Sequence, residues 1–289
     1  MVHENILHKI PLLQLRARRL LIGQYKGQHV QRSRNSQADF EQLREYCVGD
    51  DIRFIDWKSS ARGQKMVVRT YQEERDRTVL LVVDISRSST FGSTECTKER
   101  VVRECAALIA CAAAHARDRV GLVLFHEKVH TVIPPGSKAE HAIALVHALL
   151  ETPFGGLNTA FDEAVQAALL LAPKKRSLMI IVSDCMSDAV TKALPLAAAM
   201  HDVVIIRAQD TVERDIPQSL CMKFQDIETG EIFDINSKYQ MDALQNFIMQ
   251  WTREQDSFFQ KHAIDHVTIS ANPGFDETLI HFFNTRVRR

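Results

Sequence analysis

The chain contains, at residues 78–88, the run Thr78-Val79-Leu80-Leu81-Val82-Val83-Asp84-Ile85-Ser86-Arg87-Ser88. Its unbroken β-branched and leucyl part is too short to cross a membrane and is typical of a strand buried on both faces of a sheet. Asp84, Ser86 and Ser88 then bring three oxygen-bearing side chains into the loop at the carboxyl end of that strand, where open α/β sheets bind ligands. A carboxylate and two hydroxyls at alternate positions suit a hard divalent cation, because such ions prefer oxygen ligands.

Strands and helices alternate after this run, which predicts an α/β fold with a doubly wound, mostly parallel sheet of Rossmann-like type. We expect a helix at about 96–117, a strand at 119–125, an edge strand within 126–135 and a helix at about 138–151. Next come a helix at about 160–172, a strand at 177–184, a helix near 188–200 and a strand at 201–206. A hairpin, a helix at about 238–261, a strand at 266–270 and a helix at about 275–285 follow. On the long helix, Trp251 is expected in the core with Phe247, Phe258 and Phe259.

The residues before this domain have a different character. Residues 7–22 have the pattern of an amphipathic helix, and residues 35–77 mix charges and aromatics at short spacing. We predict a small α+β module there, with a turn at Gly49-Asp50-Asp51, a strand at 66–71, Arg–carboxylate pairs and a buried Trp57. The predicted domains are therefore 1–77, packed on the main domain, and 78–289, with a hairpin insertion near 222–236.

The amino-acid composition indicates which kinds of partner and which cellular compartment to expect. Lys plus Arg (36) equals Asp plus Glu (36), so net charge gives no general case for a nucleic-acid or membrane surface. The basic block from Lys9 to Arg34 is expected to be a solvated surface, and a nonspecific, salt-sensitive interaction with phosphate stays open as an alternative. The six cysteines form no CxxC pair, and neither a transmembrane segment nor a signal peptide is apparent. These features predict a cytoplasmic protein that can still dock on a membrane protein.

Two further loops supply oxygen atoms to the same edge of the predicted sheet. Asp184 ends a second apolar strand, and Thr159 closes the loop Gly155-Gly156-Leu157-Asn158-Thr159, whose glycines would let the backbone approach an ion. Each such residue taken alone can simply cap a helix. Because Asp84, Ser86, Ser88, Thr159 and Asp184 come from three separate loops, a shared metal site is the favoured interpretation.

This set of five residues resembles the metal-ion-dependent adhesion site of von Willebrand factor A-like domains. In that family the Asp and two Ser of the first loop, the Thr of the second and the Asp of the third, often through water, surround Mg²⁺. The resemblance implies that Asp84, Ser86, Ser88, Thr159 and Asp184 bind Mg²⁺ or Mn²⁺ and that an acidic residue of a partner fills the remaining position.

A second resemblance involves the residues before and after this site. Phe40-Glu41-Gln42-Leu43-Arg44-Glu45-Tyr46, the run from Gly49 to Arg62, Glu73-Glu74-Arg75-Asp76 and Asp226-x-Glu228-Thr229-Gly230 resemble the signature of the bacterial family called domain of unknown function 58. Members often lie beside genes for MoxR-type AAA+ ATPases. The resemblance implies a non-enzymatic, cation-dependent adaptor that acts with such an ATPase in protein assembly or chaperone-like remodelling.

Two alternatives remain. A Mg²⁺-dependent phosphoryl-transfer hydrolase would use Asp84 as its nucleophile, but such enzymes have an acid two residues later, where this chain has Ser86. His126 and His130 suggest zinc, yet further ligands at suitable spacing are missing, and we expect surface residues.

Overall fold

The structure is a computed structural model that describes residues 39–47, 52–63, 65–72, 77–93, 96–156, 158–186, 192–214, 222–225, 232–235, 237–272 and 274–286. The described residues form two compact units, one before residue 77 and one from residue 77 onward. The predicted helix at 7–22, the turns at 49–51 and 229–230, and the motifs at 73–76 and 226–230 lie outside the described residues.

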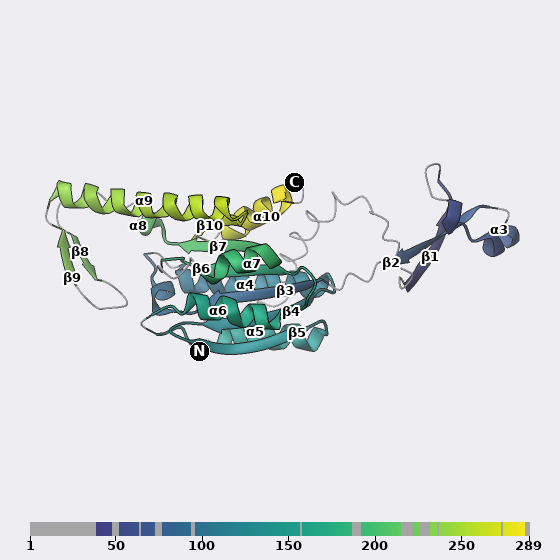
Figure 1. Cartoon of the computed structure of the whole chain (residues 1–289), viewed down its shortest axis with the longest axis horizontal. Coiled ribbons are helices and arrows are strands. Elements are labelled where there is room, and N and C mark those ends of the chain that lie inside the picture. Colours follow the sequence, from purple (N-terminus) through teal and green to yellow (C-terminus); the bar gives the residue numbers. More distant parts are fainter. Residues whose placement is uncertain are drawn as a thin grey trace. The chain divides into compact units, whose positions relative to one another are not determined.

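The larger unit is built on a six-stranded sheet (Figure 1). Its strands, in chain order, are β3 (Thr78–Asp84), β4 (Arg119–Phe125), β5 (Val129–Gly136), β6 (Leu178–Ser183), β7 (Asp202–Gln209) and β10 (Asp265–Ser270). They lie side by side in the order β10-β7-β6-β3-β4-β5, and only the edge strand β5 is antiparallel to its neighbour. The predicted doubly wound, mostly parallel fold is confirmed.

The chain reverses its direction of travel across the sheet between β3 and β6. From β3 the chain proceeds to β4 on one side, and from β6 it proceeds to β7 on the other. Ligands of open α/β sheets bind outside the carboxyl ends of the strands at such a switch point. Asp84 ends β3, and Asp184 directly follows β6, so the topology places both at this position.

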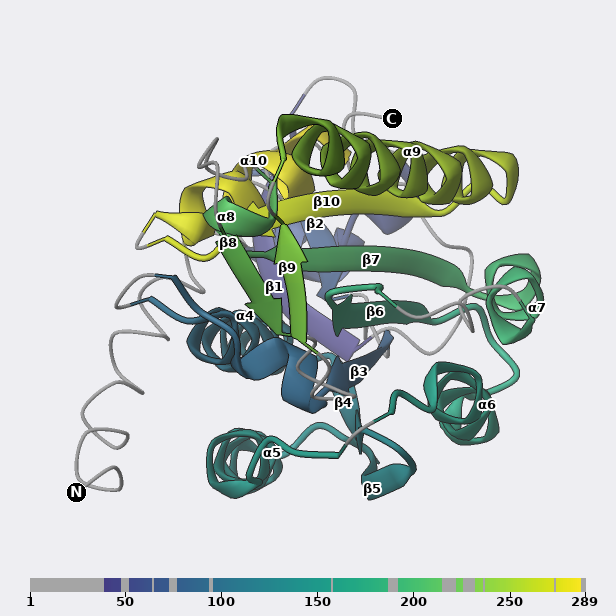
Figure 2. The same ribbon diagram turned by 90° about the vertical axis from the view of Figure 1, so that its left-hand side faces the viewer.

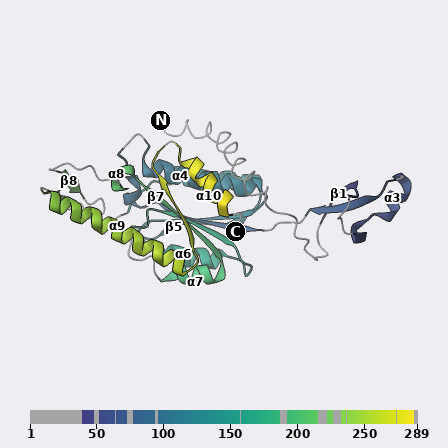
Figure 3. The ribbon, with the colours of Figure 1, turned by 90° about the horizontal axis from the view of Figure 1, so that it is seen from above.

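Helices cover both faces of the sheet (Figures 2 and 3). One face is covered by α4 (Lys98–His115), α5 (Ala139–Glu151) and α10 (Phe275–Arg286), and the other by α6 (Phe161–Leu171), α7 (Ala193–Met200) and part of α9 (Lys238–Lys261). Because alternate residues of a strand point to opposite faces, Leu81 and Val83 pack on the first side and Leu80 and Val82 on the second. All seven residues of β3 are therefore buried. Small alanine side chains on α4 let that helix lie close to the sheet.

Helix α7 spans Ala193–Met200, and its predicted start near 188 lies outside the described residues. Pro195 lies in the first turn of α7, where a missing N–H removes no intrahelical hydrogen bond, and Asp162 accepts a hydrogen bond from the Ala193 N–H (3.0 Å). Strand β7 extends beyond the predicted end at 206 to Gln209, because it pairs with β10 as far as Ser270. Its buried Arg207 is paired with Asp256 on α9 (2.8 Å).

The first part of α9 extends beyond the sheet, and a two-stranded hairpin precedes it in the chain (Figure 1). The hairpin strands are β8 (Met222–Gln225) and β9 (Ile232–Ile235), which pair antiparallel as predicted. Ile235 and Met241 form a small second core with Leu244 and Ile248. The short helix α8 (Thr211–Arg214) follows β7. No helix within the described residues has the length and apolar content that a membrane crossing requires.

The smaller unit consists of β1 (Asp39–Glu45), η1 (Ile52–Phe54), α3 (Trp57–Gly63) and β2 (Val67–Gln72). Strands β1 and β2 are antiparallel, and Ile55 forms a bridge with Val68, with both side chains buried. The prediction that Trp57 is buried is wrong, since it is 67% exposed. Within the described residues of this unit, the hairpin and the short helix bury Ile55 and Val68 but not the Trp57 side chain. The predicted packing of residues 1–77 on the main domain stays a prediction.

The aromatic residues of α9 have different environments. Phe259 is buried in the core beneath the sheet, whereas Phe247, which we also expected there, is 63% exposed on the part of α9 that carries the second core. We expect Phe259→Ala to lower the free energy of unfolding by about 3–5 kcal/mol and Phe247→Ala to change it by less than about 1 kcal/mol. Urea unfolding followed by circular dichroism measures both; equal losses would contradict the assigned packing.

Candidate metal centre

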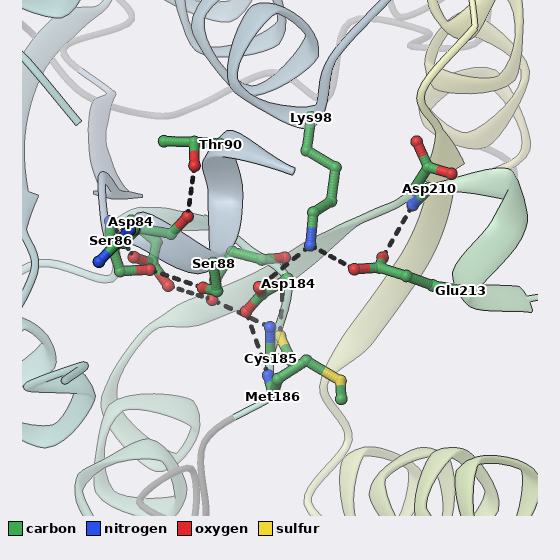
Figure 4. Close-up of polar contacts among 12 residues, drawn as sticks. Asp84, Ser86, Ser88, Thr90, Lys98, Asp184, Cys185, Met186, Asp210 and Glu213 are labelled. Carbon is green, nitrogen blue, oxygen red and sulfur yellow. Dashed lines mark hydrogen bonds and ion pairs between the residues drawn. The ribbon is translucent and has the colours of Figure 1, made fainter. Parts of the chain in front are cut away.

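The first loop of the predicted site is fixed by hydrogen bonds made directly after β3 (Figure 4). The Asp84 carboxylate accepts a hydrogen bond from the Ser86 N–H (Oδ1–N 2.9 Å), so the backbone turns immediately after the strand. The hydroxyl oxygens of Ser86 and Ser88 lie 2.9 Å apart. Asp84 and Ser86 are fully buried and Ser88 is half-buried. The three oxygen-bearing residues predicted from the sequence thus form one cluster.

The third loop lies beside the first because β3 and β6 are parallel neighbours. Val83 is in register with Val182, so the next residue of β6, Ser183, lies beside Asp84. The Ser183 hydroxyl donates to Asp84 (Oγ–Oδ2 2.7 Å) and accepts from the Cys185 N–H (3.0 Å). Cys185 has a left-handed backbone (φ 57°), which turns the chain at this point and leaves Asp184 buried at the edge of the sheet.

The second loop is fastened to the same edge by its backbone. The Gly155 N–H donates to the Ile85 carbonyl (2.9 Å), and the Ala160 N–H donates to the His126 carbonyl (2.6 Å). Thr159 lies between these two attachments and is partly buried. Within the described residues its hydroxyl makes no hydrogen bond to the other four predicted ligands. Thr159 therefore lies at the same edge of the sheet as these residues but does not contact them through a hydrogen bond.

The two glycines of this loop have different roles. Gly156 has φ +84°, and a Cβ placed on it would lie 3.0 Å from the His126 side chain. A Cβ on Gly155 would meet open space. That both glycines let the backbone approach the ion stays a prediction; Gly156 also lies in close contact with His126.

Helix capping does not account for Ser86 and Thr159, whereas Asp84 and Asp184 each accept a hydrogen bond from the backbone N–H two residues later (2.9 and 3.2 Å). Ser86 precedes the short 3-10 helix η2 (Arg87–Thr90) but makes no side-chain capping hydrogen bond. The residue that precedes α6 is Ala160 and not Thr159. Ser86 and Thr159 are therefore free of the structural role that was the alternative to metal binding.

Burial of two carboxylates at one edge creates an electrostatic problem. Burial, together with the neighbouring Asp184, raises the pKa of Asp84 to about 7, although hydrogen bonds from Ser86 and Ser183 oppose the shift. A divalent cation between the two loops would compensate both negative charges.

The hydroxyl spacing also suits Mg²⁺. Neighbouring oxygens around an octahedral Mg²⁺ with ligand distances of about 2.0–2.1 Å lie about 2.9 Å apart. Ser86 and Ser88 have this spacing. The donor set is all oxygen, which matches the preference of Mg²⁺ and Mn²⁺ over softer metals.

Sequence reasoning missed three polar residues at this edge. Ser183 orients Asp84, and the buried Lys98 places its ammonium 3.5 Å from Asp184 and 2.7 Å from Glu213 (Figure 4). A signal for Lys98 was present, because a cation in the first turn of a helix opposes the helix dipole and so calls for a partner. Its partners are 86 and 115 residues away in sequence, beyond the reach of local patterns.

The predicted histidine pair lies on the neighbouring strand connection. The rings of His126 and His130 have centroids 5.5 Å apart. Among the described residues no three His, Cys, Asp or Glu side chains are grouped to hold a metal, so these two gain no third ligand there. The zinc interpretation has no further support.

The comparison with family models confirms the predicted family. The family model described as protein of unknown function DUF58 matches residues 42–257. The uncharacterized protein Mb1516 of Mycobacterium bovis is 27% identical over 222 residues, which are 76% of this chain and 70% of that protein. The conserved hypothetical protein BatB from Bacteroides thetaiotaomicron aligns with a TM-score of 0.47 and 14% identity, over 74% of this chain and all (100%) of that chain. The SpRpn10 VWA domain aligns with a TM-score of 0.40 and 15% identity, over 70% of this chain and 93% of that chain.

The raised pKa of Asp84 predicts how the stability of the metal-free protein depends on pH. In the folded state the Asp84 carboxyl group keeps its proton up to about pH 7, whereas in the unfolded chain an Asp loses it near pH 4. The free energy of unfolding therefore falls as the pH rises through this window. Between pH 5 and pH 8, we expect the wild type to lose about 2–3 kcal/mol more than Asp84→Asn. Urea titrations in EDTA test this, and a difference that does not change with pH would contradict the assigned cause.

The two glycines of the second loop give a matched pair of variants. Gly156→Ala forces a positive φ on alanine and crowds His126, so we expect a loss of at least about 1 kcal/mol in the free energy of unfolding. Gly155→Ala meets open space, and we expect a change within about 0.5 kcal/mol. Thermal unfolding of both variants under identical conditions decides; equal losses would argue against the His126 contact.

Proposed function

Since the chain belongs to the DUF58 family of proteins of unknown function, we propose that it is a non-enzymatic adaptor that binds an acidic residue of a protein partner through Mg²⁺ or Mn²⁺. The observation that carries the proposal is the meeting of Asp84, Ser86 and Ser88 with Asp184 at the switch point of the sheet. Carboxylates and hydroxyls in this arrangement can hold a hard cation and do not enclose it.

The proposed coordination assigns a part to each loop. Ser86 and Ser88 would supply two neighbouring hydroxyl ligands, and Asp84 and Asp184 the compensating negative charge, directly or through water. Thr159 would add a third hydroxyl. Ser88 is only half-buried, and Met186, two residues after Asp184, is 59% exposed, so this edge can be reached from solvent. A carboxylate of the partner would complete the coordination.

The buried position of Asp84 argues against the phosphoryl-transfer alternative. A nucleophilic carboxylate must reach the phosphorus of its substrate, but Asp84 is 0% exposed and each of its oxygens accepts a hydrogen bond. The position two residues later is Ser86, whose hydroxyl is a poor proton donor at neutral pH. Binding without turnover is the function that these residues support.

The proposed partner is a MoxR-type AAA+ ATPase, for which the family resemblance is the support. The adaptor would join this ATPase to a client that offers an acidic side chain, in protein assembly or chaperone-like remodelling. The cytoplasm is the proposed compartment, with membrane contact only through partners. Among the described residues, Cys105, Cys111 and Cys185 are free thiols, as expected of a reducing compartment.

We expect calorimetry of Mg²⁺ with the full chain to show one saturable site that Asp84→Ala abolishes, because the variant removes the central buried carboxylate. The control is Thr90→Ala on the same loop, whose hydroxyl bonds to the Arg87 carbonyl (2.7 Å) and is not a proposed ligand; it should bind Mg²⁺ within about twofold of wild type.

The partner is tested with the same proteins immobilised. A purified MoxR-type ATPase should be retained with Mg²⁺ by wild type and Thr90→Ala, and lost in EDTA or with Asp84→Ala. Retention that is unaffected by chelation and by Asp84→Ala would refute the metal-dependent adaptor.

A further inference from the structure

A buried lysine lies beside the proposed metal centre. Lys98 is the first residue of α4 and is only 1% exposed, and its ammonium points into the edge of the sheet between Asp184 and Glu213 (Figure 4). The ammonium is 2.7 Å from Glu213 Oε1 and 3.5 Å from Asp184 Oδ2. The ring of Phe91 lies 5.8 Å from it. The proposed site for a divalent cation therefore already contains the positive charge of Lys98.

The buried position of the Lys98 ammonium raises the free energy of the folded chain. Burying an ammonium costs several kcal/mol in lost hydration, and only close anionic partners offset it. A cation next to Asp184 also repels a divalent ion bound by the same carboxylate. An apolar side chain at position 98 would avoid both costs.

The lysine keeps its charge in this environment. Burial favours the neutral amine, but the carboxylates of Asp184 and Glu213 outweigh it and hold the pKa of Lys98 above its ordinary value. Lys98 is therefore positively charged in the metal-free protein, and its ammonium lies between the two carboxylates.

Glu213 is itself held in place. It lies on α8, directly after β7, and its Oε2 accepts a hydrogen bond from the Asp210 N–H (2.9 Å). Asp210 in turn accepts hydrogen bonds from the backbone and the hydroxyl of Ser93, which follows η2 on the first loop. The position of Glu213 is thereby tied both to the end of β7 and to the segment after η2.

We propose that Lys98 is a built-in counter-cation that weakens the grip of the site on its divalent ion, and that Glu213 limits this effect by drawing the ammonium away from Asp184. The inference rests on the proposed metal-binding function and adds its regulation. In the metal-free protein, Lys98 compensates Asp184. Once the ion binds, the positive charges repel each other, and the carboxylate of a partner relieves that repulsion. Ion and acidic partner therefore bind more tightly together than separately.

The two residues have opposite expected effects on affinity for Mg²⁺. Lys98→Met removes a positive charge and keeps an unbranched side chain of similar length, so Mg²⁺ should bind about tenfold more tightly. Glu213→Gln removes a negative charge and leaves Lys98 to Asp184 alone, so Mg²⁺ should bind at least about threefold more weakly. The double variant Lys98→Met/Glu213→Gln has the wild-type net charge and should return to within about threefold of the wild type.

Calorimetry of Mg²⁺ alone with the full chain tests this, with Asp84→Ala as the non-binding reference. Arg286→Met is the matched control, because Arg286 pairs with Asp202 and Asp265 at the starts of β7 and β10, the opposite edge of the sheet. It should bind Mg²⁺ within about twofold of wild type. Circular dichroism confirms that each variant is folded, and Glu213→Gln, at a partly exposed residue, keeps the test valid if Lys98→Met does not fold.

The outcomes separate the two proposals. If wild type binds Mg²⁺ and Asp84→Ala does not, but folded Lys98→Met binds equally or more weakly, Lys98 only positions Asp184 and the inference is overturned. An unchanged or increased affinity in Glu213→Gln also overturns it. If wild type itself binds no Mg²⁺, the proposed function fails and the inference fails with it.

Discussion

The parallel pairing of β3 with β6 brings two carboxylates into one buried edge, and the rest of the site depends on that constraint. In-register pairing places Asp84 beside Ser183, so Asp184 follows within reach of the same charge. Like charges in a poorly hydrated position raise the free energy of the folded chain. The polar neighbours at this edge partly compensate the two carboxylates.

The groups that compensate the carboxylates come from different parts of the chain. Backbone and hydroxyl donors from Ser86 and Ser183 stabilise Asp84, and an ammonium from α4 stabilises Asp184. These partners satisfy the carboxylates only in part, since the pKa of Asp84 remains raised. The two faces of the sheet are covered by helices, and the carboxyl edge with its three loops is the position where an ion can supply the remaining positive charge.

The sequence was sufficient for the fold of the larger unit and for the positions of four candidate ligands, because both follow local rules. Apolar runs and helical periods located the strands and helices of the larger unit, and oxygen-bearing residues after two strands located Asp84, Ser86, Ser88 and Asp184. What it did not reveal depends on distant contacts. Lys98 meets Glu213 only after the sheet has formed, and the side chains of Trp57 and Phe247 are exposed although the local sequence pattern predicted them in a core.

The central claim is that the hydroxyls of Ser86 and Ser88 are ligands of a divalent cation and do not merely bond to each other. Crystals grown with Mn²⁺ and measured for anomalous scattering test it most directly. The account predicts one strong anomalous peak at ligand distance, about 2.2 Å, from both hydroxyl oxygens and beside Asp84. A crystal without a peak there, with Ser86 still hydrogen-bonded to Ser88, would contradict it.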